Sequence, residues 1–317
     1  MHLSKVAAKI PSQAKLTSVT RRLSRPLANP AIRVRDWYAP IARQWLAAPY
    51  HHLGEVRRIV DGTKIGFGHQ WLIVCLAYRQ RAIPITWTWV KHTRGHSTAH
   101  KQRALLAYVR RLLPPGATVL LVGDAEFGAV AVLRQVEQWG WYYGLRQRPN
   151  TRIWVATQPT WRTFGSCICR PGQSIWLGRG YLTGQHLHMT HLLVHWAAGA
   201  KMPWYLVTNL PKQTLVLAYY RRRMWVEEMF GDCKRHGFDL ESTMLRHFQR
   251  LSRLTLAVAL RYVWLISVGG RTVRSGLRHL VDRADRRDWS IFQIGLRFIE
   301  RQLINALPIH IPLVAYQ

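Results

Sequence analysis

Three apolar stretches follow one another between residues 57 and 91, with only short polar turns between them. They read RRIVDGT, QWLIVCLAYRQ and AIPITWTWVK, and their β-branched and aromatic residues favour strands. Consecutive strands joined by short turns pair antiparallel, so we predict a β-meander. Asp61 is predicted at the end of its first strand.

The segments after this meander alternate between helix and strand patterns. STAHKQRALLAYVRRLLPPG has apolar residues at helical spacing and stops at Pro114, Pro115 and Gly116. ATVLLVGDAEFG is a buried type of strand that runs into Asp124, AVAVLRQVEQWG is typical of a helix, and WYYGLRQR of a further strand. The order β-β-β-α-β-α-β predicts a mixed α/β layer fold, in which polar chemistry gathers at strand ends.

The flanking regions differ in pattern from this core. Short helices broken at Pro26, Pro30 and Pro40 are expected near the N-terminus, and a β-rich stretch between 147 and about 210 is followed by helical sequence from Val216 to Val268. We therefore predict five regions: a basic helical N-terminal region (1–54), whose positive charge favours contact with DNA, the first part of an α/β core (55–146), a β-rich insertion (147–212), the helical second part of the core (213–268) and a basic helical tail (269–317).

The chain carries a formal net charge of +31 at pH 7. So large an excess of Lys and Arg indicates a polyanionic partner, and nucleic acid fits best because basic side chains that neutralise phosphates release condensed counterions. A membrane surface is the rival partner, but the basic residues are spread along the chain, and the apolar stretch 254–270 contains Arg261 and is judged too short to span a bilayer. The N-terminus lacks the apolar core of a signal peptide, so we expect a soluble intracellular protein that does not enter a membrane. Four cysteines do not make a disulfide framework.

Acidic residues are scarce, 15 against 46 Lys and Arg, so the position of each is informative. Asp61 and Asp124 both follow an apolar strand. Aspartates at such places serve as turn or cap residues, and they also serve as metal ligands.

The stretch YYRRRMWVEEMFGDCK, residues 219–234, contains three acids. At about 100° per residue on a helix, Tyr220, Arg223, Glu227 and Lys234 fall on one face. The apolar residues of the adjoining sector are expected to pack this helix against the sheet; they are Trp225, Val226, Met229, Phe230 and Cys233.

The other two acids of this stretch, Glu228 and Asp232, fall on the far side of the helix, where a solvated position is expected. Glu227 can instead join Asp61 and Asp124 as a hard oxygen ligand for Mg²⁺. Two such ions can activate a water or a 3′-hydroxyl and stabilise the leaving oxygen in phosphodiester displacement, while nearby Arg and Lys hold the anionic backbone.

The spacing Tyr220-x2-Arg223-x3-Glu227-x6-Lys234 resembles the Y-x2-R-x3-E-x6-K signature of the insertion-sequence-four family of bacterial DDE transposases. IVDGT is similar to the first-aspartate strand of that family and VLLVGDAEFG to the second. The resemblance covers roughly residues 55–268. It implies an RNase H-like core interrupted by a β-rich insertion between the second aspartate and the catalytic glutamate.

By this resemblance, Asp61, Asp124 and Glu227 would be the catalytic, metal-binding triad, with Mg²⁺ as cofactor and Mn²⁺ able to replace it. Tyr220, Arg223 and Lys234 would contact the DNA. Two further DNA-binding positions are implied. One is Arg146. The other is Trp204, whose ring would stack on a flipped base or would otherwise be a core tryptophan.

The implied activity is cut-and-paste transposition. The protein would bind terminal inverted repeats, cleave DNA at the element ends by metal-dependent hydrolysis, and join the 3′-OH ends to target DNA. Pairing of two ends implies a homodimer, and the expected location is the bacterial cytoplasm, on the nucleoid. A non-catalytic DNA-binding protein and a stand-alone RNase H-like nuclease remain the alternatives.

A histidine-rich strand offers a different metal site. HLHMTHLLVH places His186, His188, His191 and His195 near Cys167 and Cys169. Neither spacing matches a usual structural zinc pattern, so alternating strand positions and surface contacts with DNA are the competing explanation.

Overall fold

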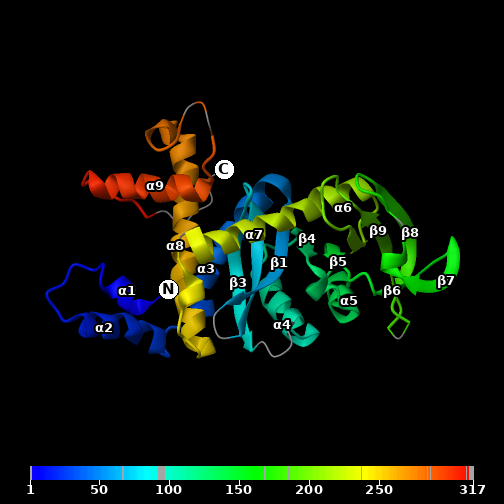
Figure 1. Ribbon diagram of the computed structural model, residues 1–317, viewed down its shortest axis with the longest axis horizontal. Coiled ribbons are helices and arrows are strands. Elements are labelled where there is room, and N and C mark those ends of the chain that lie inside the picture. The colour runs from blue at the N-terminus through cyan, green and yellow to red at the C-terminus, as the bar shows by residue number, and fades with distance from the viewer. Residues whose placement is uncertain are drawn as a thin grey trace.

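A computed structural model describes residues 2–65, 68–91, 97–167, 169–184, 186–236, 238–283, 285, 287–311 and 313, without the side chains of 52, 53, 235 and 236. One sheet dominates the fold, with helices on both of its faces (Figure 1). The mixed α/β fold predicted from the sequence is confirmed. The helices are α1 (Leu3–Ala7), α2 (Leu16–Ala28), α3 (Val34–Leu53), α4 (Ala99–Arg110), α5 (Val130–Gln138), α6 (Gln213–Tyr220), α7 (Met224–Gly231), α8 (Phe248–Arg274) and α9 (Ile291–Ile304).

The ten strands of the sheet lie in the order β3-β2-β1-β4-β5-β10-β9-β8-β6-β7. The predicted meander is confirmed, because β1, β2 and β3 pair antiparallel. Strand β4 then lies parallel to β1 on one side and to β5 on the other. The strands are β1 (Glu55–Ile65), β2 (His69–Tyr78), β3 (Arg81–Lys91), β4 (Thr118–Gly123), β5 (Tyr142–Arg146), β6 (Arg152–Val155), β7 (Gln158–Thr163), β8 (Ser174–Leu182), β9 (His188–His195) and β10 (Trp204–Thr208).

The β-rich stretch after β5 is part of the same sheet. Strand β10 pairs antiparallel with β5, so that Leu206 lies opposite Arg146, and β9, β8 and β6 continue outward from it. The strand β7 at the outer edge was not predicted, since its sequence QPTWRT has no apolar alternation. The insertion therefore extends the core sheet.

Apolar side chains fill a layer on each face of the sheet. Ile59 and Val122 point into the layer beneath α3, α7 and α8, whereas Val60 and Leu121 point into the layer covered by α4 and α5. Because side chains alternate along a strand, positions 61 and 124 are predicted to share the face of Ile59 and Val122. Helix α7 lies across that face in Figure 1.

The N-terminal helices are longer than expected. Pro26 lies inside α2, and Pro40 and Pro49 lie inside α3, so the predicted breaks at Pro26 and Pro40 are wrong. Between α2 and α3 the chain leaves helix from Asn29 to Arg33, around Pro30. A proline removes one helical hydrogen bond, and packing of α2 and α3 against the core compensates for that loss here, as the burial of Leu27 and Leu46 shows.

Helix α8 is long and apolar enough to span a membrane by length and composition, and the judgement that this stretch is too short was wrong. However, 67% of its most apolar window is buried inside the protein, so α8 acts as a core helix. Helix α9 crosses it (Figure 1). A Cβ on Gly269 would lie 2.0 Å from the carbonyl oxygen of Ile291, and one on Gly295 would lie 2.0 Å from that of Leu265. The two glycines thus permit the crossing.

Candidate active site

Asp61 and Asp124 lie side by side on two neighbouring parallel strands. The parallel pairing of β1 and β4 ends with Val60 opposite Gly123, and the two aspartates are the next residues in each strand direction. Asp61 was predicted at a strand end, but β1 continues to Ile65 because it stays paired with β2. The two aspartates are therefore aligned by the end of the parallel pairing between β1 and β4, and not by the end of β1 itself.

The Asp61 carboxylate is buried, with 3% of the residue exposed. Its Oδ1 accepts a hydrogen bond of 2.7 Å from the backbone N–H of Gly62. Its Oδ2 lies 2.8 Å from Nη2 of Arg223, but without hydrogen-bond geometry. Burial raises the pKa of Asp61 to about 7; Arg223 opposes this shift and the Asp124 carboxylate adds to it.

Asp124 caps a tight turn that follows β4. Its Oδ1 accepts a 2.9 Å hydrogen bond from the backbone N–H of Glu126, in a 3-10 turn spanning Ala125–Phe127. Burial also raises the pKa of Asp124, and the hydrogen bond from Glu126 opposes the shift. The turn-capping role that the sequence left as an alternative to metal binding is therefore present at Asp124.

Glu126 anchors this turn, and sequence reasoning missed it. Its carboxylate accepts hydrogen bonds from the backbone N–H of Ser97 at 2.7 Å, from the Ser97 hydroxyl, and from Nε2 of Gln70 at 2.7 Å. Gln102 donates to the Glu126 carbonyl oxygen at 3.0 Å. The signal was available: Glu126 is one of 15 acidic residues and lies two positions after Asp124.

Helix α7 brings Glu227 over the same face of the sheet. Its inner residues Val226, Met229 and Phe230 are buried, and Phe230 packs on Trp71 of β2 with ring centroids 5.7 Å apart. The helix therefore packs against the sheet as predicted. Glu227 itself stays exposed, with half of its side chain accessible.

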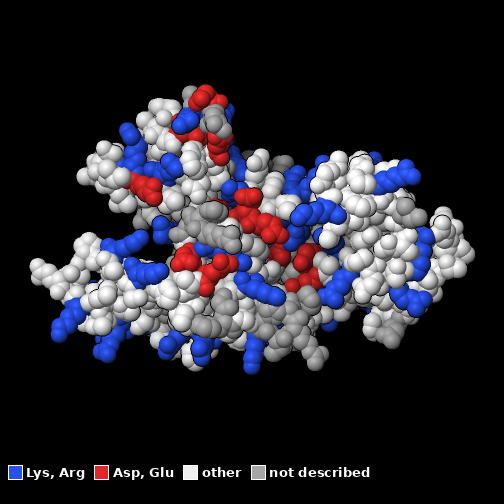
Figure 2. All heavy atoms as spheres, viewed as in Figure 1, with Lys and Arg blue, Asp and Glu red and all other residues white. Residues whose placement is uncertain are grey.

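Arg223 connects the helix acid to the strand acid. Its Nη2 donates to Oε1 of Glu227 at 2.9 Å and lies 2.8 Å from Oδ2 of Asp61. The shared face predicted for Arg223 and Glu227 is confirmed by this i,i+4 contact. Figure 2 shows acidic side chains gathered at the centre of one face, with Lys and Arg around them.

The other acids of the stretch 219–234 lie elsewhere. Glu228 is exposed, as predicted. Asp232 is buried, with its Oδ2 3.5 Å from Nε of Arg81 in β3, so its predicted solvated position is wrong. The reason is its place on the helix: Asp232 lies about 60° around the axis from the buried Met229, so it borders the face that packs on the sheet and meets Arg81 there.

Lys234 lies in the π-helical turn Asp232–His236, where its Nζ pairs with Oε1 of Glu241 at 3.3 Å. Tyr220 is 2% exposed, and its ring meets that of Trp204 edge-on at 5.0 Å. Arg146 ends β5 and donates to the Pro203 carbonyl oxygen at 3.1 Å. These placements show where the predicted DNA contacts lie, and their roles stay predictions.

The carboxylates suit a hard divalent cation by donor chemistry and by charge. Asp61 Oδ2 is a buried oxygen without a hydrogen bond, beside a second carboxyl group that disfavours its ionisation. A cation bound there would relieve both penalties. Among the described residues no three His, Cys, Asp or Glu side chains converge on one point, and Glu227 is paired with Arg223.

The histidine–cysteine zinc site that the sequence offered only as an alternative does not form within the described residues. The histidines instead bond separately: His188 meets Glu137 and Tyr143, His191 meets the Leu210 carbonyl oxygen at 2.9 Å, and His195 meets Ser174 Oγ at 2.6 Å. Cys167 and Cys169 are buried free thiols.

Comparisons with known proteins place the chain in a family. A family model described as "Transposase DDE domain" matches residues 52–264. No curated protein sequence matches the chain. Among solved structures, a cryo-EM structure of piggyBac transposase in a synaptic complex with hairpin DNA is similar at 13% identity and a TM-score of 0.45, over 93% of this chain and 66% of that one. The chain thus spans slightly less than two thirds of that protein.

Proposed function

The chain belongs to the DDE-domain transposase family, and on that premise we propose that it is a transposase of the insertion-sequence-four family that carries out cut-and-paste transposition. It would bind the terminal inverted repeats of its element, cleave at their ends and join the freed 3′-hydroxyls to target DNA. We further propose that β1 to β5, within residues 55–146, and the helical segment 213–268 form the two parts of an RNase H-like core. A pair of copies would hold the two ends.

The observation that carries this proposal is the placement of Asp61, Asp124 and Glu227. Two aspartates follow parallel-paired segments of neighbouring strands, and a glutamate lies on a helix that packs over the same face. The three would hold Mg²⁺, or Mn²⁺ in its place. The bound metal would lower the pKa of the attacking water or hydroxyl and neutralise the leaving oxygen.

The protein's own groups would bind and orient the DNA. Arg223 sits between Asp61 and Glu227, so once the carboxylates take a cation its guanidinium is free to hold a phosphate in bidentate fashion. Arg146 lies close enough to Asp124 to lower that residue's pKa and adds positive charge at the end of β5. Positioning of this kind supplies a large part of phosphoryl-transfer catalysis.

The test is cleavage and joining of DNA that carries the inverted repeats flanking the gene, with Mg²⁺ and with EDTA. We expect wild type to cleave and join, Glu227→Gln to lose both by at least about 10²-fold, and Glu228→Gln, its exposed neighbour, to behave as wild type. Cleavage without joining would support a nuclease. Absence of cleavage by the folded protein would support a non-catalytic DNA-binding role, and full activity of Glu227→Gln would exclude this glutamate.

A further inference from the structure

A groove of 830 Å³ lies beside the candidate active site, between the core and the insertion. Its near wall is the turn after Asp124 and the start of α5. Its far walls are the segment joining β5 to β6 and the turn between β8 and β9. The candidate active site described above does not use this groove.

The groove is held open by side-chain contacts between its walls. Arg134 of α5 donates to the carbonyl oxygens of His186 and Leu187, at 2.8 and 3.1 Å. Gln147, which is 6% exposed, donates to the Gly128 carbonyl oxygen at 2.8 Å. These bonds tie α5 to the β8–β9 turn and the end of β5 to the Asp124 turn, so the groove is preformed.

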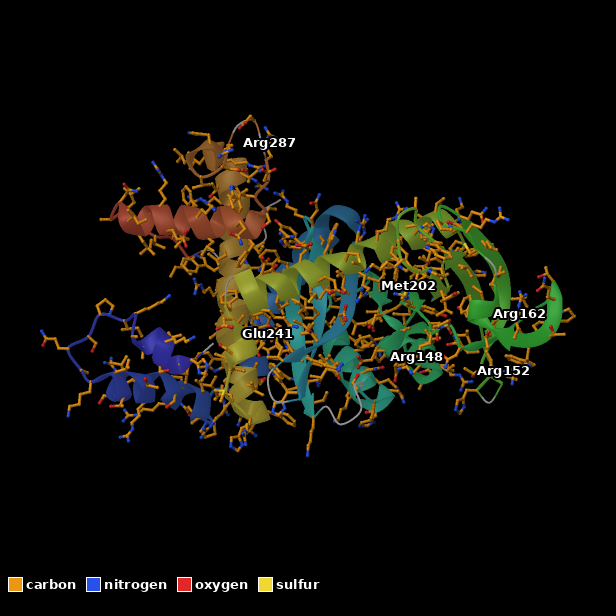
Figure 3. The ribbon with its side chains drawn as sticks, viewed as in Figure 1. Arg148, Arg152, Arg162, Met202, Glu241 and Arg287 are labelled. Atoms are coloured by element: carbon orange, nitrogen blue, oxygen red, sulfur yellow. The ribbon has the colours of Figure 1, made fainter. Side chains whose placement is uncertain are left out.

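The groove is positively charged. Arg148 and Arg152 line it, both are exposed, and neither forms an ion pair within the described part of the chain. In Figure 3 Arg152 is labelled beside β6 and Arg148 nearer to α5. The acidic lining residue, Glu126, has its carboxylate bonded to Ser97 and Gln70. The groove therefore favours an anionic ligand with several acceptor oxygens.

The position and the size of the groove define that ligand. The groove begins at Ala125, the residue after Asp124, so a strand with a phosphate at Asp124 continues directly into it. Its volume falls in the range of sites for drug-sized molecules, which holds a few nucleotides of one strand and excludes a duplex. Asn150, Thr151 and Thr183 add polar groups along its length.

We propose that this groove binds an unpaired segment of DNA strand next to the cleavage site, with Arg148 and Arg152 contacting its phosphates. The proposal rests on the proposed function for the identity of the strand. It assigns the β5–β6 segment a role in separating the strands near the cut.

Binding of two DNA probes tests it. Fluorescence anisotropy in EDTA would compare a blunt duplex with the same duplex bearing a three-nucleotide unpaired extension, 5′ or 3′, over a range of salt concentrations. We expect wild type to prefer one extended duplex by roughly tenfold, since each hydrogen bond to a charged group contributes on that order. Arg148→Ala with Arg152→Ala should abolish the preference and reduce the salt slope for the extended probe by about 1.4, the value for two single-strand phosphates.

Two variants control for charge and folding. Arg170→Ala with Arg179→Ala removes two exposed insertion arginines that do not line the groove, and it should keep the preference. Arg148→Lys with Arg152→Lys should keep most of it. Iodouracil in the extension should crosslink to peptides containing 147–152 or 182–184.

Equal loss of affinity for both probes, crosslinks confined to other elements, or loss of preference in the Arg170/Arg179 control would each overturn the proposal. The assay needs no cleavage, so a chain without transposase activity that still prefers the extended duplex would refute the proposed function alone. If wild type cleaves normally but binds the blunt and extended duplexes equally, only the proposed role of the groove is refuted.

Discussion

Nη2 of Arg223 lies 2.8 Å from Oδ2 of Asp61, and Arg223 reaches this buried strand residue from the turn that precedes helix α7. The same nitrogen donates to Glu227. One guanidinium thus balances two of the three predicted metal ligands in the metal-free protein. A metal ion bound by these carboxylates would therefore compete with Arg223 for them.

Replacing Arg223 should expose this competition. In Arg223→Gln the buried Asp61 loses its partner, which we expect to lower the free energy of unfolding by about 3 kcal/mol without metal. Because Mg²⁺ then meets no competing cation, it should raise the melting temperature of the variant more than that of wild type, while DNA cleavage falls. Thermal melts with and without Mg²⁺ measure this. If Mg²⁺ raises the melting temperature of Arg223→Gln by less than that of wild type, the proposed competition is contradicted.

The pH dependence should report Asp61. Its folded pKa of about 7 lies above the ordinary value, so between about pH 4 and 7 the folded state binds more protons than the unfolded state. The contribution of Asp61 to the free energy of unfolding of the metal-free protein is therefore fully present at low pH and is lost as pH rises through 7. Mg²⁺ needs the ionised carboxylate, so stabilisation by Mg²⁺ should grow over the same range.

Melting temperatures from pH 5.5 to 8.5, with Mg²⁺ and with EDTA, check this expectation. Asp61→Asn cannot ionise and should flatten the pH dependence of the Mg²⁺ effect. The idea fails if the variant keeps the wild-type pH profile.

Glu126 should position Asp124 through the turn that they share. In Glu126→Gln one carboxylate oxygen becomes an NH₂ that faces the donors of Ser97 and Gln70, at a cost of about 1–3 kcal/mol in the free energy of unfolding. We expect cleavage to fall at least about tenfold and the Mg²⁺ concentration for half-maximal cleavage to rise. Glu55→Gln, which removes an ion pair with Arg57 at the start of β1, should leave both unchanged. Lower stability with an unchanged Mg²⁺ requirement would show a structural role only.

Arg58 is a buried cation whose burial has an energetic cost. It is 0% exposed, its three side-chain nitrogens have no hydrogen-bond partner within the described residues, and its guanidinium lies 4.8 Å from the Trp141 ring centroid. Burial lowers its pKa to about 9. Arg58→Met should therefore raise the free energy of unfolding by about 1–3 kcal/mol, measured by urea denaturation. Arg57→Met is the more exposed control, and a clear loss of stability in Arg58→Met would show that its contact with Trp141 outweighs the cost.

The crossing of α8 and α9 should not tolerate a single added methyl group. Gly295→Ala places a Cβ 2.0 Å from the Leu265 carbonyl oxygen, and we expect it to lower the free energy of unfolding by about 1–3 kcal/mol despite the better helix propensity of alanine. Gly184→Ala, where the added atom meets open space, serves as control. Equal denaturation midpoints for the two variants would show that the helices can separate without cost.

Much of the region that carries Asp61, Asp124 and Glu227 could be predicted from local sequence patterns. Continuous apolar, β-branched and aromatic runs predicted the meander and β4, because a strand that is covered on both faces is apolar along its length. Helical spacing determined that Val226, Met229 and Phe230 face inward and that Arg223 touches Glu227. The strand β7 has neither pattern and was missed. Pro26 and Pro40 were taken as helix breaks because the hydrogen bond that a proline removes is visible in the local sequence, whereas the packing that compensates for it is not.

By itself, the sequence determined the alternation of helices and strands and pointed to Asp61 and Asp124 as acids that follow apolar strand segments. Only the tertiary structure decided that Asp232 is buried, that Glu126 anchors the Asp124 turn through Gln70 and Ser97, and that the insertion continues the core sheet and walls a basic groove. The physical reason is distance along the chain. Periodicity fixes which way a side chain points within its own element, whereas a contact between residues 70 and 126 depends on how separate elements pack.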